Sequence, residues 1–516
     1  MVYVHLSSHL LFTGSDLHYS TYIVNTDKEQ QSRIIYFDLI DNSGTSVHQW
    51  QEKIAADASN SMRISIPMEI ESGIYDLRAY TRSMLSYPAD MIFKTRVFIQ
   101  LLQDIVPDSV LVIQQSDIPT RDNTGLMNSA YNAESGILEL RFTEELQMAG
   151  LSVSLNQVSP LDSLLQTASF SETYEQFLLN SKKQSYAITP AERQGKTIRG
   201  KLVQLPDSKD LANKLVFLSF ADTTANFLYT RTDSTGAFCF MVQADYDNRE
   251  CYLQLAEGDC AINVAWLMDG NNINNDENSL EPVPLDRAQK AYLSQLKTRE
   301  LISRIYRKDQ KVNEKISGKS KPNFFQTPSM IIRPSDFIEL DDFEDICNNI
   351  LPPVRYRETE EGIQLGMVMN NKVIYGKSLV FLNGIPCLNL SYLSTLHSKD
   401  IERIELFSHR VMHGELSYQG IISIYTFNKG VTDKMFCSAV YRFDNNFHQA
   451  ASGICLKPEN EPLTENNIYW NPQMELKGEK SITIKLRKPD IGNTYCLRMN
   501  GLINNKPYSY QKLIVF

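Results

Sequence analysis

The sequence lacks the short motifs that mark most enzymes and nucleotide-binding proteins. It contains no Gly-x-x-x-x-Gly-Lys phosphate loop, no Gly-x-Gly-x-x-Gly turn, no His-Glu-x-x-His pair and no Gly-x-Ser-x-Gly elbow. Ser152, Ser154 and Ser159 lie near the ends of expected strands without such an elbow around them. Because a nucleophile needs a base within hydrogen-bond reach, usually visible in the local sequence, we expect no catalytic residues and no cofactor.

Metal-binding patterns are also missing. His5, His9 and His18 lie close together in the sequence, but no carboxylate or cysteine follows them at ligand spacing. The stretch 269–277 is rich in oxygen ligands, yet its acidic residues do not have the register of a calcium loop. We therefore predict no metal site, and we interpret residues 269–277 as a solvated linker.

Cysteine is sparse, and its spacing is uninformative. None of the 8 cysteines forms a Cys-x-x-Cys pair, which argues against the common zinc and redox motifs. We interpret them as small buried hydrophobes. Disulfides, for example Cys239–Cys260 or Cys437–Cys496, are the alternative, so cysteine usage does not fix the cellular compartment.

Long apolar runs and basic stripes are absent too. No apolar run approaches the length of about 18 residues that a membrane-spanning helix needs. The formal net charge of −10 and the absence of a basic stripe with interleaved aromatics argue against a nucleic-acid partner. No export signal is visible, because Met1 leads directly into an expected strand at 2–7.

The length and composition that remain favour a multidomain, mainly β protein. A chain of 516 residues is too long for one domain, and its 25 Tyr and 23 Phe favour β-structure. Short alternating segments bounded by turn residues predict β-sandwiches. We predict a sandwich at residues 1–104, a second at 105–195, a third at 196–266 and a last one at 431–516.

The first predicted sandwich resembles a macroglobulin-type (MG2) domain of the alpha-2-macroglobulin family. The matching residues are Val2-Tyr3-Val4-His5 and the run Ser72-Gly73-Ile74-Tyr75-Asp76-Leu77-Arg78-Ala79-Tyr80-Thr81. Inhibitors of that family trap proteases through a Cys-Gly-Glu-Gln thioester. The tetrapeptide does not occur here, so we expect no covalent trap.

The third predicted sandwich resembles a carboxypeptidase-regulatory-like domain. The residues that carry this resemblance are Ile198, Gly200, Val203, Thr232, Asp233, Gly236, Phe238 and Phe240. Such domains are normally spacers or stalks, so the resemblance implies no peptidase activity. The segment that follows, 267–332, reads as a helical and polar linker with an amphipathic helix at 284–307.

The most informative stretch lies at 379–430, within a predicted α/β domain at 333–430. Strands are predicted at 379–382, 401–407 and 420–427, and a capped helix begins near Asp341. The stretch resembles the plug domain of TonB-dependent outer-membrane receptors. The matching segments are Leu382-Asn383-Gly384-Ile385-Pro386, Asp400-Ile401-Glu402-Arg403-Ile404-Glu405-Leu406 and Gly420-Ile421-Ile422-Ser423-Ile424-Tyr425-Thr426.

A receptor plug sits inside a barrel, which takes on the order of 200 residues of strand alone. The tail at 431–516 cannot supply them, so we expect that the chain is not itself a transporter. Residues of the plug-like motif are the candidate partner contacts. They are Asn383, Gly384, Ile385, Pro386, Arg410, His413 and Gly420.

Taken together, these segments resemble envelope proteins of the Bacteroidetes type that combine macroglobulin-like and plug-like domains without a barrel. They imply a non-enzymatic docking protein of the outer membrane or periplasm, whose export signal is missing from the given chain or whose start was assigned late. The expected partner is an envelope protein, with an outer-membrane β-barrel as one candidate. The alternatives are a scaffold that binds peptide or glycan through its sandwiches, with a purely structural plug-like unit, and a hydrolase with a non-local active site.

Overall fold

The computed structural model describes most of the chain, with gaps. The described residues are 1–24, 32, 34–53, 59–113, 127–143, 149–165, 168–181, 192, 195–204, 210–221, 227–243, 250–256, 263–267, 280–306, 327–337, 339–360, 362–369, 371–428, 439–442, 465–476, 480–490 and 492–516. The oxygen-rich stretch considered for calcium, 269–277, lies outside them. Cys239 and Cys496 carry free thiols, and their considered partners Cys260 and Cys437 also lie outside the described residues.

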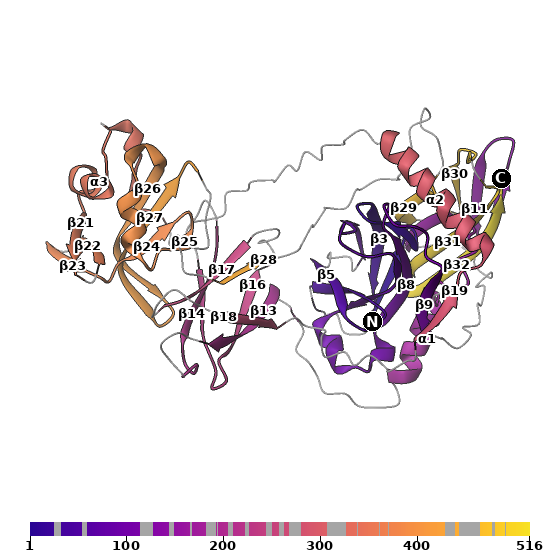
Figure 1. Ribbon diagram of the computed structural model, residues 1–516, viewed down its shortest axis with the longest axis horizontal. Helices are drawn as coiled ribbons and strands as arrows, with labels where there is room; N and C mark the ends of the chain where they lie inside the picture. The colour runs from indigo at the N-terminus through magenta and orange to yellow at the C-terminus, as the bar shows by residue number, and fades with distance from the viewer. Residues whose placement is uncertain are drawn as a thin grey trace. The chain divides into compact units, whose positions relative to one another are not determined.

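The protein is mainly β and divides into two compact units (Figure 1). Unit 1 comprises residues 1–195, 269–312 and 444–516. Unit 2 comprises residues 196–268 and 313–443. The chain therefore passes from one unit to the other four times, and neither unit is continuous in sequence.

The first sandwich of unit 1 has two sheets. One has the order β1–β3–β6, with bounds Val2–Leu6, Asp16–Ile23 and Ser59–Ser65. The other has the order β2–β8–β7–β4–β5, with bounds Leu10–Phe12, Phe93–Gln100, Gly73–Tyr80, Ile34–Ile40 and Ser46–Lys53. Two short 3₁₀ turns, η2 (Arg82–Ser86) and η3 (Ala89–Met91), precede β8. All residues of β1 are buried, so both faces of this strand are covered.

The second sandwich combines residues that are far apart in the sequence. One sheet has the order β10–β11–β30, with bounds Met127–Asn132, Ile137–Phe142 and Ser481–Lys485. The other has the order β29–β12–β31–β32, with bounds Asn467–Leu476, Ala149–Gln157, Thr494–Ile503 and Lys506–Val515. Residues 105–195 and 431–516 were predicted as separate domains. That prediction is wrong, because β12 receives both of its hydrogen-bonded neighbours from the tail.

Two helices complete unit 1. Helix α1 (Phe170–Ser181) inserts Phe170 into the core of the first sandwich, where its ring stacks on Tyr3 at a centroid distance of 4.3 Å. Helix α2 (Arg287–Tyr306) buries Tyr292, Leu293 and Leu296 against the outer face of β2 and β8. The small sheet of β9 (Ser109–Ile113) and β19 (Leu280–Pro284) joins the same cluster. The helix predicted as part of a linker at 267–332 is therefore part of the packed body.

Unit 2 contains a third sandwich and an α/β domain. The sandwich has the sheets β16–β13–β18 and β15–β14–β17–β28. Their bounds are Ala237–Gln243, Gly195–Gln204, Asn263–Leu267, Phe227–Arg231, Leu215–Phe220, Glu250–Leu255 and Ala439–Arg442. Strand β28 was predicted for the last sandwich, but it pairs with β17 at the edge of this one.

The α/β domain spans the described residues from 327 to 428. Its main sheet has the order β20–β26–β27–β24–β25, with bounds Met330–Ile332, Ile401–His413, Leu416–Thr426, Leu379–Leu382 and Ile385–Pro386. A second sheet, β21–β22–β23, has bounds Val354–Thr359, Gly362–Met369 and Lys372–Tyr375. Helix α3 (Phe343–Ile350) is capped by Asp342, not by Asp341 as predicted, because the Asp342 carboxylate accepts from the amide of Asp345. The 3₁₀ turns η4 (Pro334–Asp336), η5 (Leu390–Thr395) and η6 (Ser398–Asp400) complete the domain.

Candidate functional site

The predicted Asn-Gly turn of the plug-like motif is buried inside unit 2. Asn383 and Gly384 both adopt positive φ, 50° and 86°, which is the conformation that an Asn-Gly hairpin turn requires. The Asn383 side chain donates to Thr426 Oγ1 at 2.8 Å and accepts from the Thr426 amide at 2.9 Å. Ile385 is fully buried. The turn therefore locks β24 to the end of β27 and presents little surface to a partner.

The remaining motif residues are also used mostly within unit 2. The carbonyl of Pro386 accepts from Gln254 Nε2 of the third sandwich at 2.9 Å. The ring of His413 packs edge-on against Phe227 and Tyr229, and burial lowers its pKa. Gly420 has a φ of 90° and lies so close to Met367 that a Cβ atom would meet its side chain at 2.9 Å.

Arg410 alone among the predicted contacts is exposed, and its Nε donates to Ser417 Oγ at 2.8 Å.

An apolar interface holds the α/β domain on the third sandwich. Six fully buried side chains form it, two from the sandwich and four from the domain. They are Phe217, Phe227, Leu379, Phe381, Phe407 and Ile421. Polar contacts surround this core, because Arg231 pairs with Glu415 at 2.8 Å and the Tyr229 hydroxyl accepts from the Glu415 amide. The sandwich therefore carries the domain as one packed body.

The main sheet of the α/β domain has one covered edge and one edge that no other described strand covers. The β25 edge faces Gln254 of the third sandwich. The opposite edge is β20, which pairs only with β26 among the described strands. Ile331 on β20 is 52% exposed, and Phe337, just after η4, is 53% exposed. An open strand edge with exposed apolar side chains is the usual site of strand addition by a second chain.

In unit 1, the structure brings together residues that the sequence analysis considered separately. His5 Nδ1 lies 2.6 Å from Ser152 Oγ, and His5 Nε2 lies 3.1 Å from Ser154 Oγ. Because Ser152 Oγ donates to the carbonyl of Asn500, it accepts from Nδ1, so Ser154 donates to Nε2. Ser152 and Ser154 are fully buried, so substrate cannot reach them. This network joins the first sandwich to the second.

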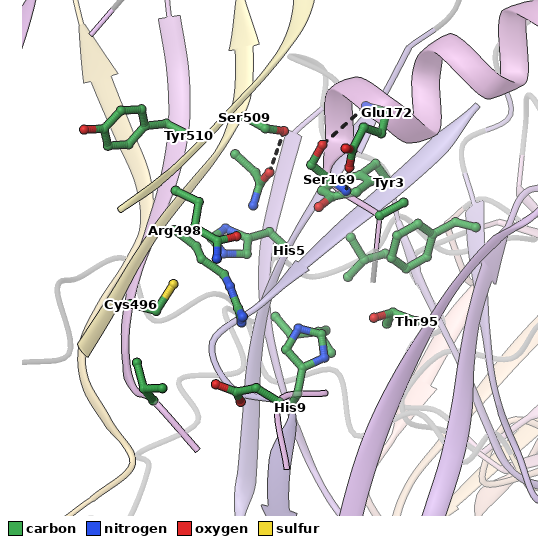
Figure 2. A pocket seen from close by; sticks show the side chains of 18 of the residues that line it. Tyr3, His5, His9, Thr95, Ser169, Glu172, Cys496, Arg498, Ser509 and Tyr510 are labelled. Atoms are coloured by element: carbon green, nitrogen blue, oxygen red, sulfur yellow. Dashed lines mark hydrogen bonds between the residues drawn. The ribbon is translucent and has the colours of Figure 1, made fainter. Parts of the chain in front are cut away.

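The same junction contains a pocket of about 320 Å³ (Figure 2). The first sandwich contributes β1 and β8, the second contributes β31 and β32, and the segment before α1 closes one side. Figure 2 shows Arg498 extending from β31 towards His5 and His9. Sequence reasoning missed this pocket, because no motif connects residues 9, 95 and 498. The early histidines were its one local signal.

Burial and the charge of Arg498 keep both histidines of the pocket neutral. Desolvation first, and then the nearby guanidinium, lower the pKa of His5 to about 3 and that of His9 to about 4. The two carboxylates that line the pocket accept hydrogen bonds from backbone amides. Glu172 accepts from the Ser169 amide at 2.8 Å, capping α1, and Asp162 accepts from the Ser159 amide at 3.0 Å. In the described part of the chain, no group of three or more His, Cys, Asp or Glu side chains is placed to hold a metal ion.

Comparisons with known proteins give structural matches only. No family model matches the sequence. No curated protein matches it either. Alpha-2-macroglobulin from Salmonella, reacted with methylamine, matches with 7% identity and a TM-score of 0.24, over 100% of this chain and 39% of that one. The native conformation of E. coli alpha-2-macroglobulin matches with 8% identity and a TM-score of 0.24, over 100% and 39%. A tetra-tandem repeat from the extending region of a large adhesion protein gives 7% identity and a TM-score of 0.12, over 100% and 98%.

This chain therefore spans about two fifths, 39%, of the length of these alpha-2-macroglobulins. Both belong to the alpha-2-macroglobulin family, and residues 1–104 of this chain resemble a sandwich domain of that family. At such TM-scores the similarity carries no argument, so the mainly β, multidomain architecture rests on the strand pairing itself. Among the described residues, none of the helices combines the length and apolarity needed to cross a bilayer.

Proposed function

We propose that this chain is a non-enzymatic binding protein of the bacterial cell envelope, and that its α/β domain docks onto a protein partner. The open β20 edge carries this proposal. The resemblance to receptor plugs supports the envelope location and an outer-membrane β-barrel as the class of partner. The closed surroundings of Ser152 and Ser154 support a binding role over a hydrolytic one.

The geometry of the β20 edge suits strand addition. Met330 and Ile331 alternate faces of the strand and are 38% and 52% exposed. An added strand would take its main-chain hydrogen bonds from the outer side of β20, and its side chains would cover Ile331 and Phe337. Since the α/β domain is fixed to the third sandwich by a packed aromatic core, the edge is preorganised, which lowers the entropic cost of docking.

Replacing Ile331 with Asp is expected to abolish capture of the partner. A charge on the edge strand would be buried by an added strand, and unpaired buried charges are strongly disfavoured. The measurement is affinity purification of the tagged chain from detergent-solubilised envelopes, with mass spectrometry of the bound proteins. We expect the unmodified chain to enrich one β-barrel protein by at least about tenfold over the variant.

The control is Val373→Asp, because Val373 is 42% exposed on β23 in the other sheet of the same domain. This variant should capture the barrel protein as well as the unmodified chain does. Equal capture by Ile331→Asp, or recovery of the chain alone, would exclude docking through this edge.

A further inference from the structure

Arg498 brings a positive charge into the pocket of unit 1, and in the described part of the chain it forms no ion pair there. It lies on β31, opposite Ser154 of β12 on one side and Gln511 of β32 on the other. In the described residues, no carboxylate lies within ion-pair distance of its guanidinium. Within the pocket its charge acts on the two neutral histidines, on the Cys496 thiol and on the Asp162 carboxylate. A planar guanidinium in a partly desolvated pocket matches a carboxylate in a two-point contact.

Thr95 is an independent sign that a ligand belongs here. It lies on β8, it is only 3% exposed, and it lines the pocket. Its Oγ1 has no hydrogen-bond partner among the described residues, although buried hydroxyls are nearly always paired. Figure 2 shows this hydroxyl directed into the pocket on the side of His9. A ligand oxygen at this position would satisfy it.

His9 supplies an acceptor beside these donors. Its Nδ1 lies 2.8 Å from the carbonyl of Arg96, which can only accept, so Nδ1 carries the proton. The neutral ring then presents Nε2 as a lone-pair acceptor, and the low pKa of His9 keeps it in that state at neutral pH. A ligand that satisfies both His9 and Arg498 therefore has an N–H group next to its carboxylate.

From this arrangement we propose that the pocket binds an α-amido carboxylate, the group that ends every peptide and every N-acylated amino acid. The carboxylate contacts Arg498 and Thr95, and the amide N–H donates to His9. Phe93 and Leu513 offer apolar surface for the side chain of the terminal residue. The volume of about 320 Å³ lies at the small end of ligand pockets, which suits one residue and its amide. This inference is independent of docking through β20.

The test is calorimetric titration of the full chain with N-acetyl-leucine, with the peptide acetyl-Gly-Gly-Ala-Leu, and with the C-terminal amide of each. Both acids are expected to bind at least about tenfold more tightly than their amides, because the amides lose the charge that Arg498 recognises. A peptide that binds more tightly than N-acetyl-leucine would identify peptide C-termini as the source. Equal affinities would identify the free acylated amino acid.

Arg498→Gln is expected to weaken binding of the acids at least about tenfold and to leave binding of the amides unchanged. Thr95→Val keeps the shape of a buried side chain. It should lower the affinity for the acids several-fold without lowering the midpoint of thermal unfolding. The control is Arg141→Gln, since the Arg141 side chain is 70% exposed on β11. The proposal is overturned if no acid binds at millimolar concentration, if acid and amide bind equally, or if both pocket variants bind like the unmodified chain.

Discussion

A chain that ends at residue 443 is expected to lose the second sandwich completely. Strand β12 lies between β29 and β31, and both neighbours come from the tail. Another tail strand, β30, pairs with β11 in the other sheet. Removal of the tail leaves β10, β11 and β12 without most of their core, and isolated strands of this kind are at best marginally stable.

Amide hydrogen exchange of β12 measures this loss directly. In the full chain, amides of residues 149–157 should exchange only through opening of the whole sandwich, at a cost of about 5–15 kcal/mol. In the truncated chain they should exchange at nearly the rate of an unfolded peptide. Residues 73–80 on β7 are the internal control, because the core of the first sandwich is formed almost entirely by its own strands.

Adding the tail back as a separate polypeptide distinguishes lost pairing from general misfolding. Coexpression of residues 444–516 with the truncated chain should restore protection of β12, because the missing strands supply pairing without any covalent link. Protection of β12 in the truncated chain alone would contradict the sheet order, and failure of the separate tail to restore it would point to misfolding.

Local signals in the sequence were sufficient to predict several of the strands and helices. The alternation at 401–407 predicted the first half of β26, and the Asn-Gly pair at 383–384 predicted the turn after β24. The periodicity at 284–307 predicted α2. These features depend on neighbours within a few residues, which is why they can be read without knowledge of the fold.

Pairing between distant strands was not predictable in the same way. A period of two residues shows which side chains of β12 face inward. It does not show that Asn156 pairs with Asn467, 311 residues further along the chain. The same limit explains why the pocket of unit 1 was not predicted from the sequence. His9 precedes β2, Thr95 lies on β8 and Arg498 lies on β31. Only the packing of the two sandwiches within unit 1 brings them to one place.

The candidate partner contacts illustrate a different limit. The plug-like motif was identified from its residue types, and these are determined by the conformation of the turn and the packing of the sheet. Asn383 and Gly384 are required by positive φ, and Gly420 by its close approach to Met367. Apart from Arg410, these motif residues are set by packing, whereas the exposed apolar side chains of the proposed docking edge are Ile331 and Phe337.

Acid should weaken unit 1 through His5. Its ring is buried, and both of its nitrogens are bonded to serines, so the native state holds it neutral with a pKa of about 3, against the ordinary value of 6.5. Well above pH 6.5 neither the native nor the unfolded chain protonates this ring, so it has no effect on stability. Below pH 6.5 the unfolded chain takes up a proton that the native state excludes, and the free energy of unfolding falls as the pH approaches 3.

The expected loss from this one group is about 2 kcal/mol between pH 7 and pH 5. His5→Gln removes the titrating group and keeps a donor and an acceptor for the two serines. The free energy of unfolding of this variant should therefore fall by about 2 kcal/mol less over the same pH interval. Urea unfolding at both pH values, read by pulsed hydrogen exchange of β1 and β12, gives the two slopes. His409→Gln, at an exposed position of unit 2, should match the unmodified chain. Since His9 is present in all three proteins, its contribution to the pH dependence cancels. Equal changes in the free energy of unfolding for His5→Gln and the unmodified chain would contradict the prediction. They would mean that His5 can be protonated at the junction of the two sandwiches in the native state.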